Sequence, residues 1–286
     1  MDNLFDGLES LGIKNLEKVK LFEEEKKVTD DNKEEKQKER AIVEADLLFD
    51  KTYKCPVCDK EFKSKSVKTG KPRLIGSDTD LRPRYAGIDS IKYDAIVCTN
   101  CGYATLSRFF GPLIPTQVKL VKENVSKTFT GLPEGGDIYT YDEALNRHKL
   151  VLYNTIIKKG KNSEKAYSCL KIAWIYRGMR ESLPEEDKKY AELSAQYQKN
   201  ENDMLSNAFE GFIAARAKED FPICGMDEMT FDYLLADIAS RIGKFDVSLK
   251  LATGIILSRN ANAKIKEKAR TLRDSVKSLT SNGEIK

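Results

Sequence analysis

The pattern of apolar and polar positions divides the chain into three segments. Residues 1–41 begin with apolar residues at helical spacing and continue into residues 23–40, which hold 14 charges and one aliphatic residue, Val28. This composition is typical of an amphipathic segment followed by a solvated helix or a disordered tether. Residues 42–131 alternate polar and apolar positions in short runs between glycines and prolines, which predicts strands and loops. From Thr140 onward, apolar residues recur every three or four positions, which predicts helices.

Local signals place the helix boundaries in the third segment. The stretch TYDE is a capping box, in which Thr140 is the N-cap and Glu143 reaches back to it. Pro184 follows Ser182, and we expect it at the first position of another helix. A further helical pattern, IPTQVKLVKENVSKTF, is expected to flank the middle segment. The helices predicted in the third segment cover residues 141–158, 163–180, 185–219, 227–241, 245–258 and 262–280.

Part of the helical segment resembles a tetratricopeptide unit. In YLLADIASRIGKFDVSLKLATGII, Ala236 and Ala252 are small residues that would let two helices approach, and Gly243 lies at the turn between them. A partial repeat around Ala173 lies 63 residues before Ala236, which is no multiple of the period of about 34 residues. We therefore expect an irregular tetratricopeptide-like array or, alternatively, a plain helical bundle.

Stacked repeats form a concave surface that usually binds another chain. Aromatic and arginine side chains are common anchors of such contacts. The alternative is that the tyrosines pack between helices with only their hydroxyl groups in water. The candidate groove contacts are Tyr176, Arg180, Tyr197, Arg216 and Tyr233.

Charge is distributed unevenly along the chain. The net charge is −6 over residues 1–50, +8 over residues 51–131 and +2 over residues 132–286, which together give the +4 of the whole chain. The basic middle segment contains side chains suited to phosphates or an acidic partner. Alternatively, a structural Asp–Arg network, with Asp80 and Arg82 pairing locally, braces this region onto the metal module. The candidate anion or partner contacts are Arg73, Arg82, Arg84, Tyr85 and Arg108.

Two absences in the sequence bear on the compartment. No stretch of about 18 apolar residues occurs, which argues against a membrane span. The start, MDNLFDGLES, lacks the basic region and apolar core of a signal peptide. We expect a cytoplasmic protein without a membrane partner, and in that compartment paired cysteines bind metal more often than they form disulfides.

Four of the six cysteines form two CxxC pairs, in KCPVCDKEF and VCTNCGYATL. Zinc favours four tetrahedral ligands, and four thiolates satisfy it. The 39 residues between Cys58 and Cys98 exceed the common spacing of about 15–20 residues, so we expect the insert to form its own hairpin. Alternatives are iron in a rubredoxin-like site, a thioredoxin-like redox pair formed by CPVC alone, and unrelated core cysteines. The predicted ligands of one Zn²⁺ per chain are Cys55, Cys58, Cys98 and Cys101.

The sequence offers no recognisable catalytic group. Four protein sulfurs leave no position open for the water that a catalytic zinc needs. The only histidine, His148, is expected at the surface or at the edge of a groove, and Cys169 and Cys224 are expected as core thiols. No Ser/His/Asp set, glycine-rich phosphate loop or HExxH motif occurs. We therefore expect no catalytic residues and no enzyme activity.

Four motifs in order resemble a known bacterial family. CPVCDKEF, DTDLRPRY, IKYDAIVC and CTNCGYA are similar to the domain of unknown function 2225 family, over roughly residues 1–220. The resemblance implies a cysteine-rich metal-binding region followed by helical repeats, and it implies no known reaction. Carried over residue by residue, it supports the four cysteines of the CxxC pairs as metal ligands and supports nothing catalytic.

The expected fold is mainly α, with a small β zinc-ribbon-like module and a C-terminal tetratricopeptide-like helical array. The expected parts are the amphipathic segment and tether at 1–41, the four-cysteine module at 42–131 and the helical domain at 132–286. The leading hypothesis is a non-enzymatic adaptor or scaffold whose helical surface binds a protein. One alternative is a nucleic-acid-binding protein that uses the basic ribbon, and a third is a metal-dependent redox or hydrolytic enzyme.

Overall fold

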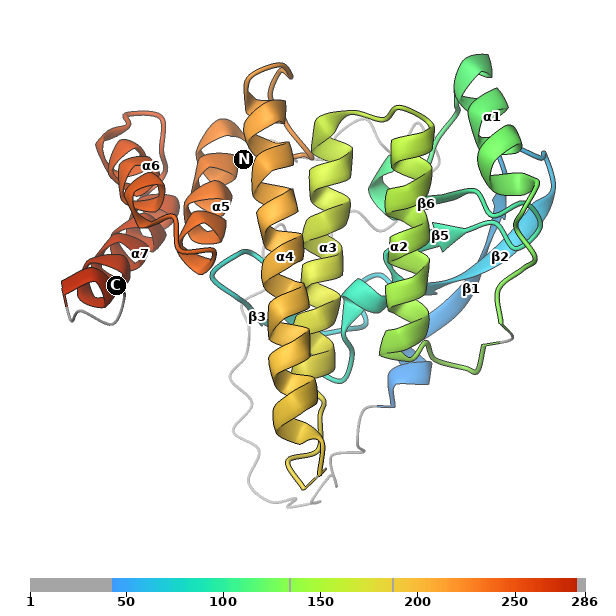
Figure 1. The fold of residues 1–286 in the computed structure, drawn as a ribbon, viewed down its shortest axis with the longest axis horizontal. Helices are drawn as coiled ribbons and strands as arrows, with labels where there is room; N and C mark the ends of the chain where they lie inside the picture. The colour runs from blue at the N-terminus through green and yellow to red at the C-terminus, as the bar shows by residue number, and fades with distance from the viewer. Residues whose placement is uncertain (1–42, 134, 187, 282–286) are drawn as a thin grey trace, which may run out of the picture. The chain divides into compact units, whose positions relative to one another are not determined.

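The computed structural model describes residues 43–133, 135–186 and 188–281, so the amphipathic segment and tether predicted at 1–41 lie outside the described residues. The described chain is mainly helical with small antiparallel strand pairs, which confirms the expected fold class (Figure 1). The strands are β1 (Leu48–Lys54), β2 (Glu61–Val67), β3 (Leu74–Ser77), β4 (Pro83–Tyr85), β5 (Ala95–Val97) and β6 (Ala104–Leu106). The helices are α1 (Pro115–Val121), α2 (Tyr141–Ile157), α3 (Asn162–Glu181), α4 (Tyr190–Arg216), α5 (Glu228–Arg241), α6 (Phe245–Leu257) and α7 (Ala263–Ser281).

The strands form hairpins in chain order, β1 with β2, β3 with β4 and β5 with β6. The pairing of β1 with β2 runs from Leu48 opposite Val67 to Lys54 opposite Glu61. The first CxxC pair lies at the tip of this hairpin, and the second lies at the tip of β5–β6. Between them, β3 and β4 form the hairpin that the long spacing between the cysteine pairs required.

The predicted helices are present, and α2 and α5 begin at residues whose side chains cap them. Thr140 and Glu143 form the expected capping box at the start of α2. The prediction for α4 is wrong at its start, because α4 begins at Tyr190 and Pro184 lies in the connection before it. The reason is that Ser182 caps the end of α3: its backbone N–H donates to Gly178 and its hydroxyl donates to Met179.

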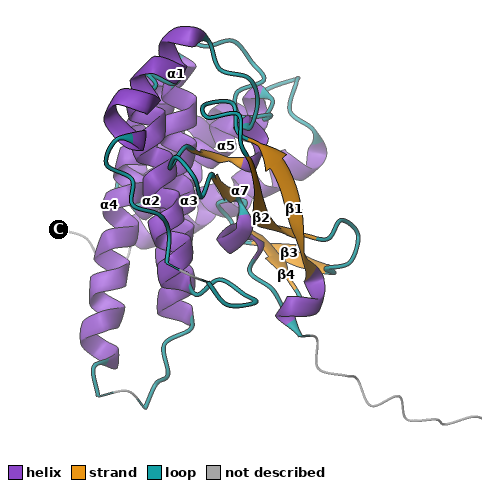
Figure 2. Ribbon diagram, turned by 90° about the vertical axis from the view of Figure 1, so that its right-hand side faces the viewer, coloured by secondary structure: helices purple, strands orange, loops and turns teal. Residues whose placement is uncertain are grey.

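Helices α2, α3 and α4 stand side by side, and the strands lie beside α2 and α3 (Figures 1 and 2). One hydrophobic core contains residues of β5 and β6, such as Ala95 and Leu106, together with residues of α2, α3, α4 and α5. The described residues, from 43 to 281 with their gaps, belong to one compact unit. Because this core crosses residue 131, the division into domains at 42–131 and 132–286 stays a prediction.

Helices α5, α6 and α7 share a smaller core that includes Ala252 and Ile265. Ala236, Ser248 and Ala252 are completely buried, as expected for small residues at a helix contact, and Gly243 adopts a φ of +77° at the turn between α5 and α6. These features agree with a tetratricopeptide-like arrangement, which remains a prediction. No helix within the described ranges combines the length and apolar composition needed to cross a membrane.

Candidate metal centre

The four cysteines of the CxxC pairs converge at the tips of two hairpins. Their sulfur atoms all lie within 4.8 Å of one another. The Sγ atoms of Cys55 and Cys101 are 3.6 Å apart, and those of Cys58 and Cys98 are 3.7 Å apart. Four sulfurs at about 2.3 Å from a tetrahedral zinc ion would be separated by about 3.8 Å. The sulfurs can therefore hold one metal ion between them without a change of fold.

The first cysteine pair sits in a tight turn between β1 and β2. The backbone N–H of Cys55 donates to the carbonyl of Lys60, and the N–H of Asp59 donates back to the carbonyl of Cys55, each over 3.0 Å. The N–H of Val57 also points at the sulfur of Cys55, at 3.4 Å. Asp59 has a φ of +61°, which Asp tolerates better than most residues. In this turn both sulfurs of the pair lie on the side that faces the second cysteine pair.

The second cysteine pair repeats the same hydrogen bonds between β5 and β6. The N–H of Cys98 donates to the carbonyl of Tyr103 over 2.8 Å, and the N–H of Gly102 donates to the carbonyl of Cys98 over 3.0 Å. Gly102 has a φ of +73°, and a Cβ atom at this position would lie 2.6 Å from the ring of Phe129. Glycine is therefore required here both for the backbone conformation and for the packing of the aromatic ring.

Apolar side chains and α2 enclose the cysteine cluster. Cys55 and Cys98 are completely buried and Cys101 is almost so. Phe110 contacts the aromatic rings that flank both turns, with centroids 6.5 Å from both Phe62 and Tyr103. From α2, the Nδ2 atom of Asn154 donates to the carbonyl of Gly102 over 3.0 Å. Cys58 is only partly buried, so the enclosure covers three of the four cysteines.

The thiols strongly affect each other's ionisation. The hydrogen bond from Cys101 holds the pKa of Cys98 far below the ordinary thiol value. Hydrogen bonds with Cys55 and Cys98, together with burial, raise the pKa of Cys101 far above it. A divalent cation would favour the thiolate form of all four, so binding would release protons.

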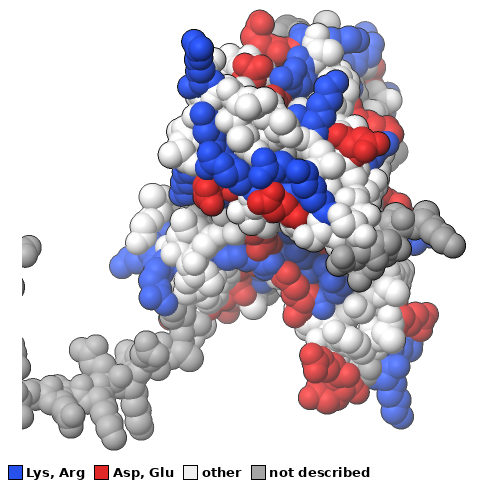
Figure 3. All heavy atoms as spheres, turned by 90° about the vertical axis from the view of Figure 1, so that its left-hand side faces the viewer, with Lys and Arg blue, Asp and Glu red and all other residues white. Residues whose placement is uncertain are grey.

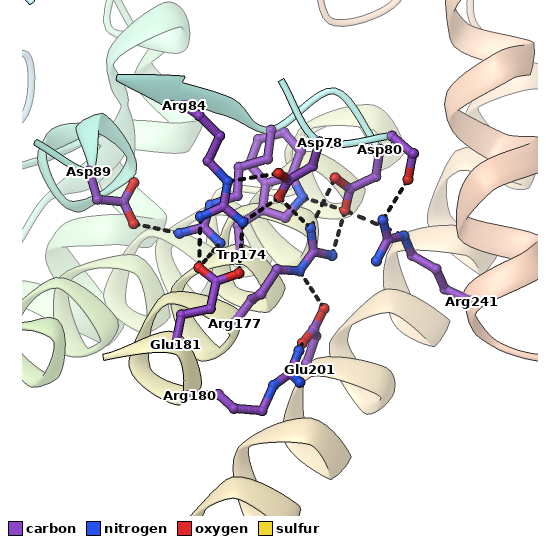
Figure 4. Close-up of polar contacts among 12 residues, drawn as sticks. Asp78, Asp80, Arg84, Asp89, Trp174, Arg177, Arg180, Glu181, Glu201 and Arg241 are labelled. Carbon is purple, nitrogen blue, oxygen red and sulfur yellow. Dashed lines mark hydrogen bonds and ion pairs between the residues drawn. The ribbon is translucent and has the colours of Figure 1, made fainter. Parts of the chain in front are cut away.

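A second constellation, an ion network, holds the insert between the cysteine pairs against the helices (Figure 4). At its centre, Arg177 of α3 donates from Nη2 to Asp80 over 2.6 Å, from Nη1 to Asp78 over 3.0 Å and from Nε to Glu201 of α4 over 2.7 Å. Trp174 donates a further bond of 2.9 Å to Asp80. Burial alone would raise the pKa of Asp80, but the hydrogen bonds and charge of Arg177 outweigh it and lower that pKa.

Two arginines of the insert complete the ion network. Arg84 binds both carboxylate oxygens of Asp78 over 2.7 Å and both oxygens of Glu181 at the end of α3 over 2.7 Å. Arg82, only 1% exposed, donates to Asp89 over 2.6 Å and to Glu181 over 3.3 Å. Their guanidinium groups are therefore engaged within the chain.

The structure corrects the expectation that Asp80 and Arg82 pair with each other and brace the insert onto the metal module. An Asp–Arg network is present, but Asp80 pairs with Arg177 and Arg82 pairs with Asp89 and Glu181, rather than with each other. The network braces the insert onto α3 and α4 instead of the metal module. Local sequence patterns could not predict these pairs, because Glu181 and Arg177 on α3 lie almost a hundred residues from Arg84 and Asp80.

The five predicted anion contacts do not meet in one place. Arg82 and Arg84 belong to the ion network, whereas Arg73 is exposed before β3 and Tyr85 packs against the small core that contains Tyr93. Arg108 lies elsewhere: it donates to the carbonyl of Cys224, and its guanidinium lies over the ring of Tyr167.

The five predicted groove contacts are also divided. Tyr176 is buried and packs against Tyr197, with ring centroids 6.4 Å apart, and Arg180 pairs with Glu201 over 3.2 Å. Arg216 binds Asp232 with a 2.7 Å bond from Nε. Tyr233 is 2% exposed and lines a groove between α5 and α7.

Tyr233 was predicted as a groove contact, but a groove between α5 and α7 was not predicted. It has a volume of about 650 Å³, and residues 77–79 of the insert form its third wall. Arg241 of α5 donates to Asp237 over 2.5 Å and to Thr79 over 2.7 Å, which ties the insert to this wall. Lys264 and Lys268 of α7 line the opposite side. The sequence signal that could have indicated this side of the groove is the four-residue spacing of the two lysines, because it places both side chains on one face of a helix.

The remaining single residues are buried. The expectation that His148 lies at a surface or groove edge is wrong: it is 1% exposed, and its Nδ1 bonds to the carbonyl of Ala144 over 2.7 Å. Burial lowers its pKa. Cys169 and Cys224 are core thiols as expected, and burial raises the pKa of Cys169 to about 11 and that of Cys224 to about 12.

Comparison with known families gives one match. The model described as "Uncharacterized protein conserved in bacteria (DUF2225)" matches residues 48–276. The match includes both CxxC pairs, the insert and the helices into α7, so it extends further toward the C-terminus than the 1–220 expected from the motifs. No curated protein and no solved structure matches the chain.

Proposed function

Since the chain belongs to the DUF2225 family of uncharacterized bacterial proteins, its role must be argued from its own residues, and we propose a non-enzymatic, zinc-stabilised adaptor. In this proposal the groove between α5 and α7 binds a segment of a partner protein. The groove is the observation that carries it. It lies where two helices and the insert meet, and it combines an aromatic ring with charged groups of both signs.

The groove has features that suit a peptide segment. Helices α5 and α7 contact each other although α6 lies between them in sequence, as alternate helices do in stacked helical repeats. Arg241 is exposed and belongs to a residue type that commonly anchors protein contacts, whereas Tyr233 is almost completely buried beneath the groove. Lys264 and Lys268 stand across the groove from Asp237. The side of the molecule with α6 and α7 presents Lys and Arg close to Asp and Glu (Figure 3), so a partner segment with both charges fits better than a uniformly acidic one.

The proposed metal is one Zn²⁺ bound by the four cysteines. Four cysteine thiolates that close the coordination sphere are typical of a structural zinc site, and here three of the four are buried and Cys58 is partly buried. In the proposal, zinc joins the two hairpins and fixes the ends of the insert, and the ion network fixes its middle. The insert in turn supplies Thr79 to the wall of the groove. The metal therefore acts on partner binding at a distance, through the position of the insert.

A site-specific crosslink in the native cell tests this proposal. A photoreactive amino acid is placed in the full-length chain at Thr271, which lines the groove, or at Lys277, which is exposed on α7 outside it. We expect a defined protein crosslink from position 271 that is absent from position 277 and persists after treatment with RNase and DNase.

Charge reversal provides the matched control. The variant K264E/K268E changes two groove residues and should abolish the crosslink from position 271. The variant K250E/K277E makes the same change of charge on exposed residues outside the groove and should retain it. Equal crosslinks from both positions, or a crosslink unaffected by K264E/K268E, would refute the adaptor proposal. Nuclease-sensitive material instead would favour the nucleic-acid alternative.

A further inference from the structure

A second cavity lies on the other side of the insert, between the β1–β2 hairpin and α3. It has a volume of about 430 Å³, within the range of about 300–1,000 Å³ that small-molecule sites occupy. It shares no lining residue with the groove between α5 and α7. The adaptor proposal makes no use of it.

Two cations meet at one aromatic ring in this cavity. The Cζ atom of Arg108 lies 4.7 Å from the ring centroid of Tyr167, and the Nζ atom of Lys171 lies 5.0 Å from the same centroid. The two charges are therefore at most 9.7 Å apart. Arg108 is held in place by its bond to the carbonyl of Cys224. Both residues line the cavity, so an anionic group bound there lies within the field of two positive charges.

The cavity carries an excess of positive charge. Asp94 is the single carboxylate among its lining residues, and Lys171 already pairs with it over 3.0 Å. Ser107 also donates to Asp94. Neither Arg108 nor Lys51, which both line the cavity, forms an ion pair with any residue in the described part of the chain. A concave surface with uncompensated cations attracts anions.

The wall of the cavity that β1 forms is partly aromatic. Phe49, Lys51 and Tyr53 alternate along β1 and so share one face of the strand. All three line the cavity, and Phe49 is 43% exposed. Ser66, the register partner of Phe49 on β2, lines it as well. This wall can contact the planar or apolar body of a small molecule while its anionic group faces Arg108.

From this arrangement we propose that the cavity binds a small organic phosphate. The phosphate contacts Arg108 and Lys171, and a planar body packs against Phe49 and Tyr53. Arginine matches phosphate with two parallel hydrogen bonds, and Lys171 keeps its charge because Asp94 counteracts the burial that would lower its pKa. The site serves ligand recognition, and no reaction is assigned to it.

Isothermal titration calorimetry on the full-length protein tests the proposal with adenosine monophosphate, ribose 5-phosphate and adenosine as probes. We expect both phosphates to bind and adenosine to give no heat, with adenosine monophosphate binding more tightly than ribose 5-phosphate. The variant R108Q should weaken both phosphates at least tenfold. The matched variant R73Q removes the same charge at an exposed position outside the cavity and should leave binding unchanged.

A second variant separates the two parts of the cavity. F49A removes an exposed side chain and should weaken adenosine monophosphate several-fold while leaving ribose 5-phosphate unaffected. Absence of heat with both phosphates at millimolar concentration overturns the proposal. Equal binding of adenosine and its monophosphate, or equal loss in R108Q and R73Q, does the same.

Discussion

Replacement of Arg177 by methionine should lower the free energy of unfolding by about 3–5 kcal/mol. Methionine keeps most of the aliphatic stem but removes every hydrogen bond that the guanidinium donates. Asp80 is completely buried and Glu201 is 2% exposed, so both carboxylates would lose their principal cation inside the protein. Removal of one partner of a buried ion pair typically costs about this amount, because the remaining charge stays desolvated.

Arg180 provides the control on the same helix. It lies one turn after Arg177, is about one-third exposed and pairs with Glu201 at 3.2 Å. Since Arg177 would still neutralise Glu201 in R180M, we expect a loss of about 1 kcal/mol or less. Both variants replace arginine by methionine on the same helix. The difference between their losses of unfolding free energy therefore reports on the buried part of the network.

The assay is chemical denaturation of the zinc-loaded protein, followed by circular dichroism at constant pH. A double-mutant cycle adds D80N in both backgrounds, because Asp80 loses its partner in R177M. D80N should therefore destabilise R177M by at least about 1.5 kcal/mol less than it destabilises the wild type. Equal losses in R177M and R180M, or additive effects in the cycle, would show that the network does not stabilise the fold as argued.

Three further predictions concern the metal centre and the ion network. Purified wild-type protein should contain about one equivalent of zinc by elemental analysis and C98S should contain almost none, because three thiolates leave the tetrahedral site incomplete; full occupancy in C98S would contradict the assignment of ligands. G102A should destabilise the zinc-loaded protein by about 2 kcal/mol or more, and G70A by about 1 kcal/mol, in denaturant titrations. Both glycines have a positive φ, but only the Cβ at 102 meets a ring at 2.6 Å, so equal losses would count against that packing. Since the pKa values of Asp78 and Asp80 are lowered below 3.8 in the folded chain, the stability they contribute is complete above about pH 4 and should be lost as the pH falls through the lower folded values; the pH titration of R177M should be flatter there, and an equally steep one would be evidence against this linkage.

Features set by neighbouring residues could be predicted from the sequence. The capping box of Thr140 and Glu143 fixed the start of α2, and α5 was expected at 227–241 and lies at Glu228–Arg241. The spacing within each CxxC pair predicted that the sulfurs converge, because each turn is closed by hydrogen bonds within six residues. These interactions do not depend on how the rest of the chain folds.

Features set by distant residues could not be predicted in the same way. Asp80 has an arginine two residues away in sequence, yet its partner is Arg177, 97 positions further along the chain. The sequence shows the charges but not which helix faces them. His148 was expected at the surface or at the edge of a groove, whereas α2 contacts β5 and β6 as well as α3. When several neighbours cover a helix, polar positions become buried that the pattern of an amphipathic helix, with one apolar and one polar face, would assign to solvent.

The repeated turns at the two cysteine pairs have a consequence for protein engineering. Each turn is closed by its own hydrogen bonds, so the metal geometry is independent of what joins residues 67 and 95. The entropy of closing that connection grows slowly, by about 0.6 kcal/mol for each doubling of length. A grafted segment, such as a loop taken from another binding protein, could replace the connection and leave the metal centre intact. The graft would forfeit the ion network together with the buried side chains of Ile88, Ile91 and Tyr93, so its loss of stability would measure how much the connection contributes to the fold.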